Sequence, residues 1–374
     1  MLKKFEIEGF KSFENKFTLD LAKANNYDSN RETVDNSITR VYSIFGKNGS
    51  GKSNLGLALL DAMNHLTDGR EKTSIAINPY LNLDRNDFAE FTYYFSFEND
   101  DIIYNYRKAA VDELIYERVY INGNIAIEYD YIEKKGCCNL KCAENLKLDL
   151  KGRGLSITKY VRNNSVLDDN EENGAFKKFY NYIENMILIN SFDLNRCFGC
   201  ECRGELIESY IVKSGKLKDF EYFLQSLDIK CNLESVNLDG REIILNKFKK
   251  GSMRFFETAP VGMRSLALIY YCLVSDIDES MIFVDGLDVY DCELAEKIVR
   301  EMVKRKPSSQ IIFTSHNTNL MTNELLCDRL LWVWVEDMIL EYKYSNFKSI
   351  KDEVLFLESQ LKTCALFENI IWCK

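Results

Sequence analysis

The sequence is short of proline, histidine and long apolar runs. Three prolines in 374 residues leave no Pro-rich linker, and no internal repeat or low-complexity tract divides the chain. The apolar runs fall well short of the roughly 18 residues that a membrane-spanning helix needs, so no membrane partner is expected. The opening MLKKFEIEGF has no secretory h-region, which favours a cytoplasmic protein.

A surplus of positive charge is also missing. The chain has 48 lysines and arginines against 58 acidic residues, which gives a formal net charge of −10. This balance disfavours a surface that wraps nucleic acid throughout. Nucleic acid stays open as a partner through one basic run, although such a run is more often a solvated strand face: Lys247, Lys249, Lys250 and Arg254.

Cysteine, by contrast, is plentiful, with 12 in the chain. Six of them form two clusters: Cys137, Cys138 and Cys142, and then Cys197, Cys200 and Cys202. Cys197 and Cys200 have the spacing of zinc ligands, but the second ligand pair would have to come from the distant first cluster, with no histidine near. Reduced, partly buried thiols are the simpler interpretation, and a zinc site is the alternative.

The most informative stretch is Val41–Leu66. Val41–Phe45 is bulky and apolar, as a buried parallel strand requires, and apolar residues recur at helical spacing from Leu55 onward. Between them stands a complete G-x-x-x-x-G-K-[ST]. Its glycines let backbone N–H groups surround phosphate oxygens, its lysine reaches the β- and γ-phosphates, and its serine hydroxyl ligates Mg²⁺. We therefore expect a nucleotide site formed by Gly46, Lys47, Asn48, Gly49, Ser50, Gly51, Lys52, Ser53 and Asn54.

The remaining patterns predict an α/β fold with an antiparallel subdomain. Alternating aromatic residues over 88–132 indicate an antiparallel meander. The order helix 262–274, strand 281–285, helix 291–304 and strand 310–314 indicates a parallel sheet. Other expected elements are strands Leu2–Glu8, Lys16–Leu21, Glu242–Phe248, Met253–Glu257 and Leu330–Val335, helices around Phe176–Met186 and Leu217–Leu227, and a C-terminal helix near 350–368.

Two of these strands end in residues that carry chemistry. The buried strand Met281–Asp285 ends in an acid, and an Asp at the carboxyl end of a central strand is where a P-loop fold holds the Mg²⁺ water shell. The later strand ends in His316, while the other histidine, His65, is expected to be structural. Before both, APVGMRSL places Gly262 in a turn that opens an apolar helix.

Together these motifs resemble the ABC-type ATPase head of the SMC/RecF-like class. The resemblance rests on FEIEGFKSFENKFTLDL, the Walker A loop, a signature-like APVGMRS, the Walker B segment FVD and the switch-histidine region TSHNTNLM. More closely, GKSNLGLALLDAMNHLTD, ITKYVRNNSVL and SHNTNLMTN resemble the compact heads of bacterial anti-phage and abortive-infection loci. Such heads often pair with a nuclease or toxin subunit.

The resemblance implies a P-loop NTPase fold and two heads that dimerise head to tail around ATP and Mg²⁺. Lys52 and Ser53 would then contact phosphate and Mg²⁺, and Asp285 would be the Walker B acid, both catalytic and metal-ligating. His316 would be a catalytic contact to the γ-phosphate. Gly262 would be the signature glycine that faces the ATP bound in the other subunit.

Three departures from the family pattern matter. Gly286 stands where the family has the glutamate that polarises water, and Val261 stands at the signature serine. Asp288 fits either the family's D-loop aspartate or a helix cap. The third departure is that no glutamine lies between residues 54 and 224, so the Q-loop ligand would have to come from Asn78, Asn82 or Asn86.

The expected protein is thus an ATP-binding head that hydrolyses ATP slowly and forms an ATP-gated dimer in a bacterial defence-type complex. The alternative is a non-hydrolysing, nucleotide-locked scaffold that holds a nuclease or toxin partner. The expected organisation is an N-terminal ATPase lobe over 1–136, a mixed, helical insertion over 137–240 and a C-terminal ATPase lobe over 241–374.

Overall fold

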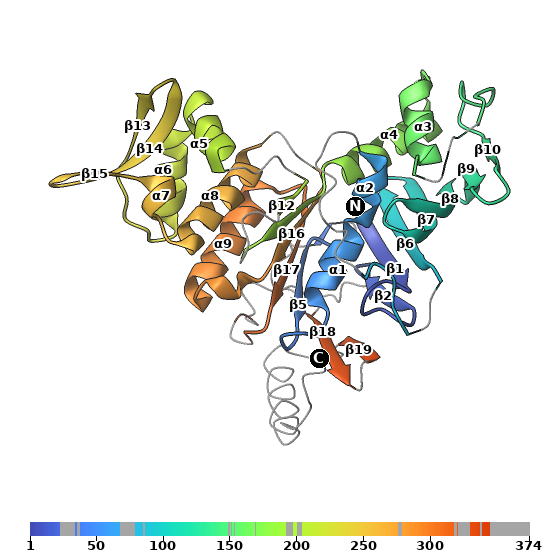
Figure 1. The fold of residues 1–374 in the computed structure, drawn as a ribbon, viewed down its shortest axis with the longest axis horizontal. Coiled ribbons are helices and arrows are strands. Elements are labelled where there is room, and N and C mark those ends of the chain that lie inside the picture. The colour runs from blue at the N-terminus through green and yellow to red at the C-terminus, as the bar shows by residue number, and fades with distance from the viewer. Residues whose placement is uncertain are drawn as a thin grey trace.

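A parallel sheet occupies the centre of the computed structural model, with an antiparallel sheet on one side and a helical lobe on the other (Figure 1). The structure describes residues 1–22, 34–35, 38–67, 79–84, 87–148, 150, 152, 154–168, 170–191, 197–199, 204–275, 279–317, 320, 330–336 and 339–344. The expected C-terminal helix near 350–368 lies outside these residues. Among the described helices, none has the length and apolarity needed to cross a membrane.

The central sheet has the strand order β12-β11-β16-β17-β5-β18-β19. Its inner strands β11, β16, β17, β5 and β18 run parallel to one another. Their bounds, with the antiparallel edge strands, are β5 Val41–Phe45, β11 Ile187–Asn190, β12 Cys197–Phe198, β16 Met281–Asp285, β17 Gln310–Ser315, β18 Leu330–Glu336 and β19 Ile339–Tyr344. The parallel sheet predicted from the C-terminal pattern is therefore confirmed, and β11 joins it from the stretch expected to be an insertion.

The antiparallel sheet has the order β10-β9-β8-β7-β6-β1-β2. It contains the expected aromatic meander, now with the N-terminal strands added beside β6. The bounds are β1 Leu2–Glu8, β2 Phe17–Asp20, β6 Ala89–Phe97, β7 Asp100–Ala110, β8 Glu113–Ile121, β9 Asn124–Asp130 and β10 Lys135–Cys138. Two short strands, β3 Val34–Asp35 and β4 Ile38–Thr39, pair with each other ahead of β5.

Helices cover both faces of the parallel sheet. On the side of the antiparallel sheet are α1 Lys52–Leu59, α2 Asp61–Leu66, α3 Ile157–Asn164 and α4 Glu171–Glu184. On the opposite side are α5 Gly204–Lys213, α6 Leu217–Ser226, α7 Phe255–Thr258, α8 Val261–Val274 and α9 Cys292–Arg305. A small sheet of β13 Leu233–Leu238, β14 Arg241–Phe248 and β15 Gly251–Arg254 extends this second lobe outward (Figure 1).

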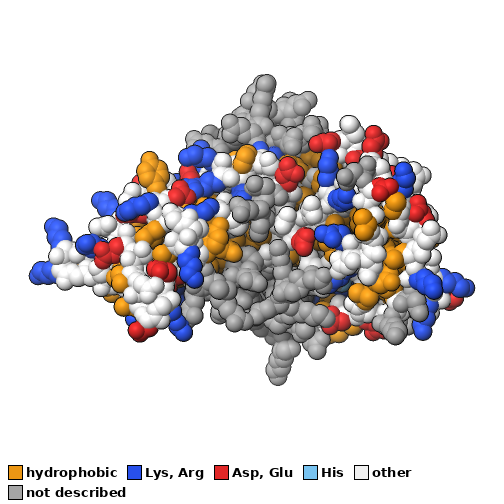
Figure 2. All heavy atoms as spheres, turned by 90° about the horizontal axis from the view of Figure 1, so that it is seen from above, with side chains coloured by type: hydrophobic (Ala, Val, Ile, Leu, Met, Phe, Trp, Pro, Cys, Tyr) orange, Lys and Arg blue, Asp and Glu red, His pale blue; other side chains and the backbone are white. Residues whose placement is uncertain are grey.

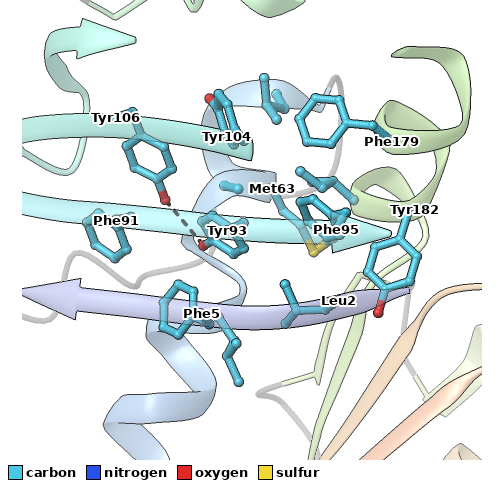
Figure 3. Packing of buried hydrophobic residues seen from close by; sticks show 14 of the residues in the cluster. Leu2, Phe5, Met63, Phe91, Tyr93, Phe95, Tyr104, Tyr106, Phe179 and Tyr182 are labelled. Carbon is cyan, nitrogen blue, oxygen red and sulfur yellow. Dashed lines mark hydrogen bonds between the residues drawn. The ribbon is translucent and has the colours of Figure 1, made fainter. Parts of the chain in front are cut away.

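Two apolar cores result from the alternation of side chains along the parallel strands. In β5, Tyr42 and Ile44 face the antiparallel sheet, while Val41 and Phe45 face the helical lobe. The first core contains many aromatic rings. Figure 3 shows Phe5, Phe91, Tyr93, Phe95, Tyr104, Tyr106, Phe179 and Tyr182 meeting from β1, β6, β7 and α4.

Two local predictions were wrong. The helix expected from Leu55 to Leu66 breaks at Leu60 into α1 and α2, and the Tyr93 hydroxyl donates to the Ala58 carbonyl oxygen at 2.9 Å just before the break. The strand expected over Met253–Glu257 ends at Arg254. Phe255 then starts the short helix α7, because its ring is buried edge-on against Phe220.

Candidate nucleotide-binding site

Three strand ends meet at one edge of the parallel sheet. Because β16, β17 and β5 are neighbours and parallel, their carboxyl ends place Asp285, Ser315 and Gly46 side by side. The Gly46 N–H donates to the Ser315 carbonyl oxygen at 3.3 Å. The predicted phosphate loop, acid and histidine therefore lie at a single edge, although they come from distant parts of the sequence.

The loop between β5 and α1 has the backbone that a phosphate cradle needs. Gly49 and Gly51 have φ of 85° and 92°, a left-handed conformation that other residues rarely adopt. Nothing lies within 4 Å of a Cβ added at Gly49, so the loop is open on that side. The Ser50 hydroxyl is buried without a hydrogen-bond partner, an arrangement that favours a polar ligand. These features fit a bound phosphate chain.

Lys52 lies folded into this loop. Its ammonium donates to the carbonyl oxygens of Gly46 at 2.5 Å and Lys47 at 2.8 Å. Burial lowers the pKa of Lys52, while the nearby charges of Asp288 and Asp285 oppose that shift. The two carboxylates are thus close enough to act on the lysine, and a triphosphate would bring negative charge to the same place. Ser53, the next residue, is exposed in the first turn of α1.

Asp285 is buried and oriented by the neighbouring strand. Its Oδ1 accepts a hydrogen bond from the Thr314 hydroxyl at 2.8 Å, and the same hydroxyl oxygen accepts from the Gly286 N–H at 2.8 Å. Gly286 has a φ of 82°. The bond to Thr314 therefore orients the Asp285 carboxylate at the end of β16.

Asp288 contacts the end of β17 and the two residues that follow it. Its carboxylate accepts from the Ser315 hydroxyl, from the His316 N–H at 3.0 Å and from the Asn317 N–H at 3.3 Å. His316 Nδ1 also lies 2.9 Å from Asp288 Oδ2. The Asp288 side chain is 7% exposed and the His316 side chain 49% exposed, so the imidazole reaches solvent while the carboxylate does not.

A turn between β1 and β2 braces the loop, and sequence reasoning missed this role. The Asn54 side-chain amide donates to the Ser12 hydroxyl at 2.9 Å. Asn82 supports the same turn, since its side-chain amide donates to the Lys11 carbonyl oxygen at 2.7 Å and its backbone N–H to that of Gly9 at 2.9 Å. The only signal available was the FKSF turn itself, which the sequence places far from both partners.

Asn82 was one of three candidates for the Q-loop ligand. Its side chain is already engaged at both ends, because its Oδ1 accepts from the Asp84 N–H at 3.0 Å. Asn78 and Asn86 lie outside the described residues. Among the described residues, Asn82 therefore supports the β1–β2 turn and its side chain is not directed to a ligand.

Gly262 lies in the first turn of α8. A Cβ added there would approach the Tyr290 ring at 3.6 Å, an ordinary contact. The Tyr290 hydroxyl donates to Ser265 Oγ at 2.7 Å and fixes the start of the helix. Val261 precedes Gly262 and is 44% exposed. The structure thus presents this helix start to solvent as an exposed surface.

The basic run lies on the β14–β15 hairpin, where Lys and Arg side chains gather at one end of the molecule (Figure 2). Lys247 pairs with Glu234 at 3.2 Å, and Arg254 pairs with Glu257. The hairpin is mostly exposed, as a solvated strand face would be.

The cysteine clusters do not come together as a metal site in the described residues. No group of three or more ligating side chains there could hold an ion, and Cys137 and Cys142 are exposed while Cys138 is buried. Cys200 and Cys202 lie outside the described residues, and so does the side chain of Cys197.

No protein-family model and no curated protein matches the sequence. Solved structures match over most of the chain. An SMC head bound to the C-terminal winged-helix domain of ScpA is 15% identical, with a TM-score of 0.54, and the match covers 92% of this chain and 98% of that one. A Pyrococcus furiosus SMC head with an extended coiled coil, bound to the C-terminal domain of ScpA, is 13% identical, with a TM-score of 0.53 and coverage of 96% and 99%. The chain therefore has the α/β fold of SMC heads.

Proposed function

We propose that the chain is an SMC-like ATPase head that binds ATP with Mg²⁺ at the edge formed by β5, β16 and β17. One observation carries the proposal. A left-handed glycine loop, with Lys52 folded into it, is hydrogen-bonded to the end of β17, next to the strand end that carries Asp285. Backbone N–H groups and an ammonium at a helix start bind phosphate, and a carboxylate opposite them suits the metal that accompanies it.

Ser53 and Asp285 are the residues that would hold Mg²⁺, the first through its hydroxyl and the second through the carboxylate oxygen not used by Thr314. The ion would neutralise charge on the phosphates as the bond to the γ-phosphoryl group breaks. Lys52 would exchange its loop carbonyls for phosphate oxygens. Lys47, Asn48, Gly49 and Gly51 would contribute backbone N–H groups and Ser50 its hydroxyl. The Gly46 N–H would anchor the loop to Ser315, and Asn54 would hold the loop against the β1–β2 turn.

Equilibrium binding of a fluorescent ATP analogue tests this proposal. Lys52→Ala should lose most of the affinity, because it removes a buried charged contact. Lys47→Ala is the matched control, since Lys47 lies in the same loop but is exposed, and we expect only a small change there. Unchanged affinity in the Lys52 variant would contradict the assignment.

We also propose that hydrolysis is slow and that two heads associate around ATP. Glycine at position 286 supplies no carboxylate to a water molecule, and general-base help is worth about 10²–10⁴-fold. The exposed start of α8 at Val261 and Gly262 would face the partner's triphosphate. One partner would then be a second copy of the chain. The resemblance to defence-type heads suggests a nuclease or toxin subunit as another.

A non-hydrolysing scaffold is the second candidate, and the left-handed Gly286 favours it. Single-turnover hydrolysis separates the two, because a scaffold would bind ATP and leave it intact for hours. Co-purification with the product of the neighbouring reading frame tests the effector partner. A partner retained with ATP and lost in the Lys52→Ala variant would support an ATP-gated complex of either kind.

A further inference from the structure

The three aspartates at and after the end of β16 differ in the hydrogen bonds that their carboxylates accept. Asp285 is positioned by Thr314 and is the metal-ligand candidate. Asp291 caps α9, where its side chain accepts from the Leu294 N–H at 2.9 Å. Asp288 accepts hydrogen bonds from Ser315, the last residue of β17, and from the two residues that follow it, and its side chain is 7% exposed. Hence the Asp288 carboxylate, which is buried and already accepts these bonds, is not placed to accept a proton from water directly.

The imidazole of His316 is the group that does reach solvent at this place. Its Nδ1 lies 2.9 Å from Asp288 Oδ2, so the ring is held on that edge by a carboxylate. A carboxylate that accepts from Nδ1–H fixes the proton on Nδ1 and leaves the Nε2 lone pair on the opposite edge of the ring. Such a ring is oriented to accept a proton, and the carboxylate stabilises the imidazolium that results.

The backbone contacts make this orientation firm. Asp288 accepts from both the His316 N–H and the His316 ring, so the same carboxylate holds the main chain and side chain of one residue. The Ser315 hydroxyl donates to Asp288 and the Ser315 carbonyl oxygen accepts from the Gly46 N–H at 3.3 Å, which places the pair beside the phosphate loop.

We propose that Asp288 and His316 form a carboxylate–imidazole dyad that supplies the residual general-base help of this slow hydrolysis, in the absence of a glutamate at position 286. This inference rests on the proposed ATPase function. His316 Nε2 accepts a proton from water while the water oxygen bonds to the γ-phosphorus and the bond from that phosphorus to the β–γ bridging oxygen breaks. The products are ADP and phosphate, and the imidazolium then returns its proton to solvent. His316 is the catalytic residue and Asp288 its positioning residue.

Chemical rescue tests the role of His316. We expect His316→Ala to turn bound ATP over about 10²-fold more slowly in single-turnover measurements at saturating ATP. Added imidazole should restore part of the rate, and a series of substituted imidazoles should give rates that rise with their pKa, as general-base catalysis requires. Rescue that is absent or independent of imidazole pKa would overturn the dyad, and so would wild-type turnover in the His316→Ala variant.

The positioning role of Asp288 is tested by a measurement that a purely structural role would leave unchanged. The chain holds two histidines, so His65→Gln leaves His316 as the one imidazole visible by ¹⁵N NMR. We expect the neutral ring to carry its proton on Nδ1, and Asp288→Asn to shift that tautomer toward Nε2–H. The same variant should lower kcat about tenfold or more with little change in KM, and Asp288→Glu should recover part of the loss.

The experimental outcomes distinguish failure of the proposed ATPase function from failure of the dyad. Loss of ATP binding in the wild-type chain would remove the proposed function itself. ATP binding with no measurable hydrolysis, or a ring that keeps the same tautomer in the Asp288→Asn variant, would overturn the dyad alone.

Discussion

A Cβ atom on Gly56 would come within 2.6 Å of Phe283 Cε1, so α1 lies in direct contact with the strand that carries Asp285. The Phe283 ring is fully buried and has no room to move aside. The helix behind the phosphate loop is thereby fixed at one distance from the acid.

Gly56→Ala should therefore destabilise the fold, although alanine is the better helix former. Overpacking costs about 1–3 kcal/mol, which exceeds the ~1 kcal/mol that alanine gains over glycine in a helix. Gly174→Ala is the matched control, because Gly174 also lies in a helix but nothing stands within 4 Å of its added Cβ. Urea unfolding of both variants should give shifts of opposite sign. A stabilised Gly56→Ala would contradict the tight contact.

The buried pair Lys108–Asp61 gives a second prediction. Its atoms lie 2.7 Å apart with both side chains fully buried, and Asp61 also accepts from the hydroxyls of Tyr80 and Tyr106. Lys108→Met leaves a buried carboxylate without its cation, which should cost about 3–5 kcal/mol. The exposed pair Lys178–Glu98 is the control, and Lys178→Met should cost about 0–1 kcal/mol. Comparable losses at both sites would show that burial does not govern the effect.

His65 predicts a pH dependence. Burial, and secondarily the charge of Lys108, hold its pKa well below 6.5, and its Nε2 lies 2.6 Å from the Tyr104 hydroxyl. The folded state therefore keeps the ring neutral while the unfolded chain takes up a proton below about pH 6.5. Stability from this residue falls as pH decreases, by up to about 1.4 kcal/mol per pH unit, until the folded pKa is reached.

Unfolding free energies between pH 7.5 and 5.5 check this prediction. The difference between the wild-type chain and His65→Gln isolates His65, because His316 and the carboxylates are present in both. Parallel pH profiles for the wild-type chain and His65→Gln would mean that His65 takes up a proton in the folded state as readily as in the unfolded chain.

Gly286 predicts the result of restoring the family's glutamate. Its φ of 82° and the bond from its N–H to Thr314 fix a left-handed turn, which costs other residues about 1–2 kcal/mol. Gly286→Glu should therefore lose stability, and Gly286→Ala should lose as much without adding a carboxylate. If turnover rises in the first variant but not the second, the new carboxylate reaches water despite the strain. Equal rates in both would mean that it does not.

Val261 offers a test of association. Val261→Asp puts a negative charge at the start of α8, where the helix dipole favours it, so folding should be unharmed or improved by about 0.3–1 kcal/mol. The same charge would face the partner's triphosphate and should weaken ATP-dependent dimerisation in light scattering. Val261→Ser, which supplies the family's hydroxyl, should strengthen it. Equal association in both variants would argue against this surface as the clamp.

Much of the fold and of the candidate site follows from local sequence. The segment from Gly46 to Ser53 specifies its own turn, and the apolar strand before Asp285 specifies its place in a parallel sheet. What escaped prediction depends on distant partners. Ser12 meets Asn54 across 42 residues and Asn82 meets Lys11 across 71. The break at Leu60 and the early end of β15 likewise come from tertiary contacts, to Tyr93 and Phe220, that no periodicity reveals.

The strand order has a consequence for synthesis on the ribosome. β5, which leads into the phosphate loop, pairs with β17 and β18, and the backbone of Leu2 exchanges hydrogen bonds with the Gln310 side chain. Translation adds about 5–20 residues per second, so β5 waits on the order of 10–50 s for its first neighbour to be made. Until then the N-terminal segment is a nascent chain with an open apolar edge, and the loop acquires its supporting acid and histidine only after residues 285 and 316 have been made.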